Sequence, residues 1–118
     1  MKRIDHLLFQ ADTDFIAYFD ALPVPSGDYD DHDYCAWFAR FLAGRVRSKK
    51  DIRHAINAIE AIMKDGGWNA EQLCRGFFPA LNHEVKDEAL RSSLEELLGP
   101  ISKTEWARLQ VIEKPQVI

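Results

Sequence analysis

The densest group of chemically active side chains in the sequence is an acidic stretch with an aromatic ring near each end. It reads Asp28-Tyr29-Asp30-Asp31-His32-Asp33-Tyr34 and places four carboxylates within six positions. A calcium loop would use such carboxylates as oxygen ligands. The spacing does not fit one, because Asp33 and Ala39 stand where the turn glycine and the closing glutamate belong. We therefore expect no metal, and no other cofactor motif is present.

The same stretch suits contact with a basic protein. Dense carboxylates steer a basic partner and accelerate its association, and tyrosines supply rigid contact area with a polar tip. The candidate partner-binding residues are Asp28, Tyr29, Asp30, Asp31, Asp33 and Tyr34. The alternative interpretation is that these acids only solvate a loop and cap the helix that follows.

A basic segment comes next in the chain. Within residues 34–54, Asp51 is the only acid, and the six basic side chains are Arg40, Arg45, Arg47, Lys49, Lys50 and Arg53. Basic residues gather at helix carboxyl ends because of the helix dipole, and no glycine-rich loop accompanies them to bind phosphate. The formal net charge of the whole chain is −4. Because nucleic-acid binders are normally basic, we expect no nucleic-acid partner.

Side chains that could catalyse a reaction are dispersed. The histidines lie far apart, at His6, His32, His54 and His83. None of them forms a metal-binding pair such as H-E-x-x-H. Cys35 and Cys74 have no C-x-x-C partner and no basic neighbourhood that would activate a thiolate. We expect two buried thiols and no enzymatic activity.

Apolar residues recur at helical spacing along almost the whole chain. The expected helices cover residues 4–22, with a possible restart at 12–14, and then 30–47, 48–65, 69–81, 86–98 and 102–114. Capping boxes are expected at Ser48 with Asp51 and at Ser102 with Glu105. Asn69 is expected to cap the fourth helix, which Pro79 should end or kink.

No segment alternates with the period of a strand, so the fold class is all-α. The chain has 118 residues, of which 47% are hydrophobic and 29% are charged. That length and composition fit one hydrophobic core. We expect a single domain over residues 1–118, built as a bundle of about five to six antiparallel helices arranged in hairpins.

The expected location is the cytoplasm. The first residues, Met1 to His6, begin with basic side chains, but polar residues interrupt the apolar run that a signal peptide needs. No stretch approaches 18 consecutive apolar residues, so we expect no contact with a membrane. Two cysteines are too few for the disulfide framework of a small secreted domain.

The size, acidity, helix number and acidic aromatic loop at Asp28–Tyr34 together resemble the small all-helical immunity proteins that bacteria pair with secreted toxins. Such proteins bind tightly and occlude the active site or a docking surface of the toxin. The resemblance implies a cytoplasmic inhibitor whose acidic loop meets a basic cleft of its partner. It transfers no individual residue, because no motif is matched.

Two other functions stay open. The first is a helical accessory or regulatory domain that forms a homodimer through Trp68, Phe78 or the carboxyl tail. Trp68 follows Gly67 at a helix junction, where it either covers the corner between helices or, if exposed, anchors a partner. The second is a small enzyme with a dispersed site, which would require a concave cluster of titratable groups.

Overall fold

Residues 3–23 and 29–112 are described by a computed structural model, and within these ranges every regular element is helical. The α-helices are α1 (Ile4–Ala11), α2 (Asp14–Asp20), α3 (Asp31–Arg47), α4 (Arg53–Asp65), α5 (Gly67–Gln72), α6 (Phe78–Glu84), α7 (Glu88–Leu97) and α8 (Pro100–Ile112). A π-helical turn, η1 (Leu73–Phe77), joins α5 to α6 without interruption. The all-α fold class is therefore confirmed.

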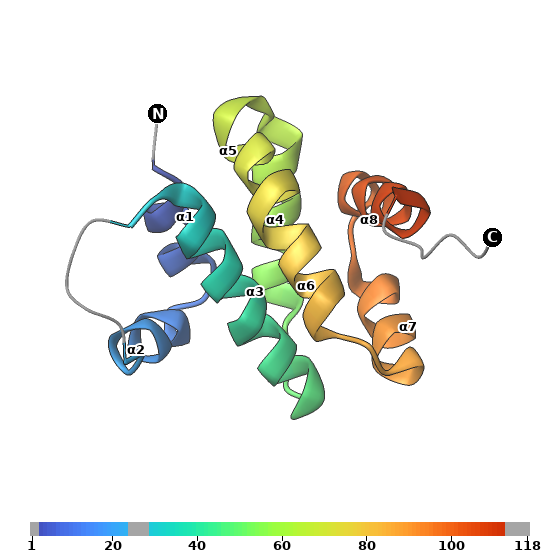
Figure 1. The fold of residues 1–118 in the computed structure, drawn as a ribbon, viewed down its shortest axis with the longest axis horizontal. Coiled ribbons are helices and arrows are strands. Elements are labelled where there is room, and N and C mark those ends of the chain that lie inside the picture. Colours follow the sequence, from blue (N-terminus) through green and yellow to red (C-terminus); the bar gives the residue numbers. More distant parts are fainter. Residues whose placement is uncertain (1–2, 24–28, 113–118) are drawn as a thin grey trace.

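Helix α3 lies at the centre of the fold. Figure 1 shows α1 and α2 toward one end of the long axis and α7 and α8 toward the other, with α3 and α6 between them. The buried residues of α3 are Cys35, Phe38, Ala39, Phe41, Leu42, Ala43 and Val46. This set covers more than one stripe of the helix, as expected where neighbours pack on several sides. Helix α3 contacts α1, α2, η1 and α6.

The described residues form seven continuous helical segments, rather than the five or six expected. The first expected helix is split because Asp12 adopts an extended backbone, with φ −154° and ψ 112°. Its carboxylate also accepts a hydrogen bond from the backbone N–H of Asp14 at 3.0 Å. The restart expected at residues 12–14 is thus confirmed, and it raises the number of segments.

Helix α3 and the η1–α6 segment run parallel to each other. His32, near the start of α3, lies against Gly76, and Arg47, at its end, donates a hydrogen bond to the backbone oxygen of Glu84 at 3.1 Å. The amino ends of the two segments therefore lie together, and so do their carboxyl ends. Consecutive helices joined by short loops favour antiparallel pairing, but this central pair is separated in sequence by α4 and α5.

Three helix starts differ from expectation. Ser48 ends α3 instead of opening α4, because α3 continues through Gly44 and the chain turns at Lys49, whose φ is +57°. Asn69 lies inside α5, which begins at Gly67. The capping box expected at Ser102 is also wrong, since α8 begins earlier, at Pro100, and Ser102 is fully buried within it.

Pro79 does not end its helix. Immediately before it, the N–H of Phe78 bonds to the carbonyl of Leu73, five residues back, in the π-helical turn. A π turn changes the hydrogen-bond register, so the missing N–H of proline is accommodated without breaking the segment. The same segment buries Phe78 completely. Phe78 therefore cannot supply a surface for self-association in this fold.

Glu60 of α4 holds the first turn of α8. Its carboxylate accepts hydrogen bonds from the backbone N–H of Ile101 at 2.9 Å and of Ser102 at 2.8 Å, and from the Ser102 hydroxyl at 2.9 Å. Burial alone would raise the pKa of Glu60, but these hydrogen bonds outweigh it and lower the pKa. A side chain from another helix thus satisfies amides that the start of α8 leaves open.

No helix within residues 3–23 and 29–112 combines the length and the apolar character needed to cross a lipid bilayer.

Candidate protein-binding surface

The acidic residues of the candidate loop lie at the start of α3. Asp30 caps this helix by accepting the N–H of Asp33 at 2.9 Å, and the Asp33 carboxylate accepts the N–H of Asp30 at 3.2 Å. The two residues form a reciprocal capping box, so the capping role weighed as an alternative is real. Asp28 lies outside the described residues. Capping buries neither Asp30 nor Asp33, so it does not remove them from a binding surface.

The tyrosines of the loop pack inward. Tyr34 stacks on Phe19 with ring centroids 5.4 Å apart, and Tyr29 meets Trp37 edge to face at 4.9 Å. Both tyrosines are half-buried in an aromatic cluster that joins α1, α2 and α3. The hydroxyl of Tyr29 is buried and has no hydrogen-bond partner among the described residues. The tyrosines therefore hold the acidic turn in place, and their contact with a partner stays a prediction.

Trp68 is the exposed aromatic residue beside these carboxylates. Its indole N–H donates a hydrogen bond of 2.7 Å to the carboxylate of Asp31, 37 positions earlier in the chain, and its exposed fraction is 53%. The chain reaches Trp68 through Gly66 and Gly67, both with φ +72°. Only glycine adopts this backbone without strain. The two glycines thus direct α5 so that Trp68 returns to the start of α3.

The carboxylates at this position are not neutralised by basic side chains of the described chain. Elsewhere, arginines form ion pairs with acids, as Arg45 does with Asp12 and Asp14. Within residues 3–23 and 29–112, no Lys, Arg or His forms a salt bridge with Asp30, Asp31 or Asp33. We call Asp30, Asp31, Asp33 and Trp68 the Trp68–Asp31 surface.

The cysteines lie beside acidic groups. Burial, together with the nearby Asp31 and Asp30 carboxylates, raises the pKa of the Cys35 thiol to about 12. Burial, together with the Glu105 carboxylate, raises the pKa of the half-buried Cys74 to about 11. Both cysteines are free. Both thiols therefore hold their protons at neutral pH.

Most arginines of the basic segment have partners within the chain. Arg47 bonds to the backbone of Glu84, Arg53 pairs with Asp51 at 2.8 Å, and the guanidinium of Arg45 also lies 4.8 Å from the centroid of the Phe41 ring. These pairs join α3 to its neighbours or stabilise a helix start. The helix-end interpretation of this segment is consistent with these contacts.

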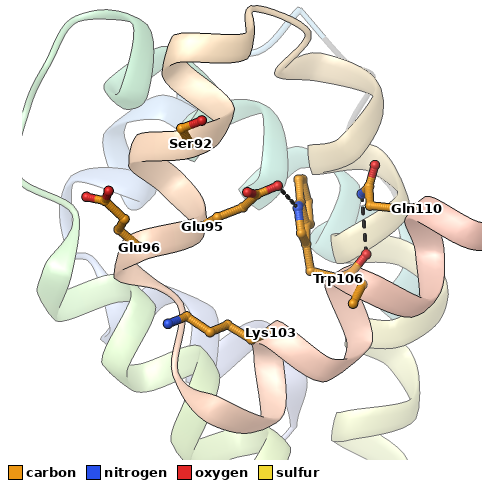
Figure 2. A pocket seen from close by; sticks show the side chains of 7 residues that line it. Ser92, Glu95, Glu96, Lys103, Trp106 and Gln110 are labelled. Carbon is orange, nitrogen blue, oxygen red and sulfur yellow. Dashed lines mark hydrogen bonds between the residues drawn. The ribbon is translucent and has the colours of Figure 1, made fainter.

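A hollow between α7 and α8, with a volume of about 630 Å³, is a second candidate site. Figure 2 shows Glu95 of α7 reaching across to the indole of Trp106, with Glu96 and Lys103 beside the opening. The Trp106 N–H donates to Glu95 at 2.9 Å, and its ring is only 3% exposed. Because Glu95 of α7 and Trp106 of α8 are hydrogen-bonded to each other across the hollow, we interpret it as the seam between two packed helices.

Two of the scattered histidines come together in space. His32 of α3 and His83 of α6 line one groove, together with Arg40, Arg75 and Glu84. Sequence reasoning missed this convergence, because it depends on the parallel pairing of α3 with η1–α6. The groove supplies a concave cluster of titratable groups, which the enzyme hypothesis requires.

Comparison of the chain with models of protein families, with curated proteins and with solved structures finds no match.

Proposed function

We propose that this chain is a cytoplasmic protein-binding protein that uses the Trp68–Asp31 surface to bind a basic partner. The observation that carries the proposal is the contact between the exposed Trp68 and Asp31, within a set of carboxylates that no basic side chain of the described chain pairs with. Tryptophan is among the residues that most often dominate binding energy at protein interfaces.

The two parts of this surface contribute differently to binding. The carboxylates attract a basic partner over a distance of about 8–10 Å at physiological ionic strength, which speeds association. The indole ring supplies apolar and cation–π contact once the partner is seated, which slows dissociation. The hydrogen bond to Asp31 fixes the indole before binding, so less side-chain freedom is lost on association.

An inhibitory purpose follows from this chemistry and from the resemblance to immunity proteins. A toxin that acts on nucleic acid or another anionic substrate carries a basic cleft. An acidic surface with a central aromatic anchor can occupy such a cleft and exclude the substrate. We therefore propose neutralisation of a toxin or effector by occlusion as the purpose of the interaction.

The test uses the wild-type chain and two charge-reversed variants as bait in a lysate of the source cell. Asp31→Lys changes the Trp68–Asp31 surface, and Glu96→Lys makes the same change in charge at an exposed position on α7. We expect wild type and Glu96→Lys to retain one stoichiometric partner that moderate salt releases, and Asp31→Lys to lose it. Thermal unfolding of both variants checks that they remain folded.

Two outcomes would contradict the proposal. One is equal retention of the partner by both variants, which would place the binding surface elsewhere. The other is recovery of the chain alone, with sedimentation showing a dimer that dissociates on dilution. That result would favour the self-associating regulatory domain, for which the contact would be Trp68 or the carboxyl tail, which lies outside the described residues.

A further inference from the structure

A groove between α3 and the η1–α6 segment carries basic and titratable side chains on both walls. Its volume is about 320 Å³. We call it the histidine–arginine groove, and its polar side chains are His32, Arg40, Arg75, His83 and Glu84. None of these residues belongs to the Trp68–Asp31 surface.

The groove exists because small residues line its floor. On α3, His32, Ala36 and Arg40 follow one another at intervals of four residues, so they share one face of the helix. Ala80 lies opposite on α6. A small residue between two larger ones leaves a depression with the large side chains at its ends.

Gly76 places the imidazole of His32 against the helix opposite. A β-carbon at position 76 would lie 3.2 Å from Nδ1 of His32 and 3.0 Å from the β-carbon of Cys35. Any larger residue would therefore push His32 away from the groove wall. Gly76 belongs to the π-helical turn η1, and such turns occur frequently at functional sites.

The arginines of the groove keep hydrogen-bonding capacity. The Nε of Arg40 lies 3.7 Å from a carboxylate oxygen of Glu84, and Arg75 pairs with Glu71 at 2.6 Å. A guanidinium has five N–H donors, so one such contact leaves several for a ligand. The imidazoles of His32 and His83 have no hydrogen-bond partner among the described residues. The lining thus presents donors from two helices and a single carboxylate.

We propose that the histidine–arginine groove binds the phosphate group of a small phosphomonoester. Arg40 and Arg75 line the groove from different helices, and a guanidinium group can bond phosphate oxygens in a bidentate manner. The volume is close to the lower limit of about 300 Å³ for ligand pockets, which restricts the ligand to a phosphate with a small organic group. Within the described ranges, no three His, Cys, Asp or Glu side chains are placed to hold a metal ion.

The experiment titrates the full chain with inorganic phosphate and with ribose 5-phosphate, followed by backbone amide chemical shifts. Two variants accompany the wild type. Arg75→Gln removes a groove arginine, and Arg53→Gln removes an exposed arginine that also pairs with a nearby carboxylate but lies outside the groove. Each variant loses one positive charge and one surface ion pair with a nearby carboxylate.

We expect saturable shifts around Gly76, His32 and His83, with ribose 5-phosphate binding at least as tightly as inorganic phosphate. Loss of a charge-assisted hydrogen bond in Arg75→Gln should weaken binding by about tenfold, and Arg53→Gln should leave it unchanged. The proposal is overturned if the shifts do not saturate, if they centre on Lys49 and Lys50, or if both variants lose affinity equally.

Discussion

The regions around Trp68 and Trp106 share the same local chemistry and differ in exposure. Each indole N–H donates to a carboxylate from another helix, Asp31 at 2.7 Å and Glu95 at 2.9 Å. Trp68 is 53% exposed, whereas Trp106 is 3% exposed. A tryptophan–carboxylate pair is therefore no indication of function by itself. What surrounds the ring decides whether the pair stabilises the fold or remains available to a partner.

Around Trp106, neighbouring side chains cover the indole ring. Arg91 lies 4.9 Å from the centroid of the Trp106 ring. The same guanidinium donates to the side chain of Asn82 and to that of Gln110, each at 2.7 Å, and to the backbone oxygen of Val85 at 2.6 Å. These contacts connect α6, α7 and α8 through directional hydrogen bonds. Around Trp68, the described chain supplies a carboxylate and leaves half of the side chain open.

The largest expected effect separates the two tryptophans by stability. Trp106→Ala should lower the free energy of unfolding by about 3–5 kcal/mol, because it empties a buried site and leaves Arg91 and Glu95 without their shared partner. Trp68→Ala should lower it by no more than about 1 kcal/mol, because it removes an exposed ring and one surface hydrogen bond. Urea unfolding monitored by circular dichroism measures both. Equal losses would mean that Trp68 is a structural residue.

The second prediction concerns the attachment of α8 to α4. Glu60→Gln should lower the free energy of unfolding by about 1 kcal/mol, because the amide group accepts fewer hydrogen bonds from the start of α8. Gly99→Ala should give a similar loss, since a β-carbon there would lie 2.4 Å from Cδ of Glu60 and displace that side chain. In the double variant the losses should not add, because both act through one contact. Additive losses would contradict this explanation.

The contribution of Glu60 should also depend on pH. Its folded pKa is lowered below the ordinary value of 4.5. A carboxyl with a lowered folded pKa stabilises the fold above its unfolded pKa, and the stabilisation is lost as the pH falls through the folded pKa. The stability difference between wild type and Glu60→Gln should therefore be constant near neutral pH and shrink below about pH 4.5. A difference that grows on acidification would show that the carboxylate is not the stabilising form.

The smallest expected effect lies under the candidate surface. Tyr29→Phe should raise the free energy of unfolding by about 1 kcal/mol, because it removes a buried hydroxyl that has no hydrogen-bond partner within residues 3–23 and 29–112. Tyr18→Phe, in the same aromatic cluster, serves as the control and should leave stability unchanged. A loss of stability in Tyr29→Phe would show that the hydroxyl has a partner in solution.

The helices could be predicted from the sequence because their signals are local. Apolar periodicity predicted helices over 30–47 and 48–65, where α3 and α4 lie, and Asp30 caps the start of α3. The errors arose where a long-range contact overrode a local signal. The local sequence predicts that Ser102 is an N-cap, but its hydroxyl donates a hydrogen bond to Glu60 of another helix. Pro79 predicts a helix end, but the π-helical turn η1 lets the helical segment continue past it.

The candidate site was only half predictable for the same reason. The acidic residues are adjacent in sequence, so their density is visible there. The contact of Trp68 with Asp31 spans 37 positions and depends on how α5 returns to α3. The Gly66-Gly67 pair before Trp68 was the available signal, because two residues with positive φ redirect a chain sharply. The convergence of His32 and His83 had no signal in the sequence.

The most direct test of the central claim is a double-mutant cycle on binding, using the partner captured by the wild-type chain. Dissociation constants are measured for wild type, Asp31→Asn, Trp68→Ala, the double variant and the control Glu96→Gln. We expect Trp68→Ala to weaken binding by about tenfold or more. The double variant should lose less than the two single losses combined, because the residues act as one surface. Binding by Trp68→Ala that matches Glu96→Gln and wild type would contradict the account.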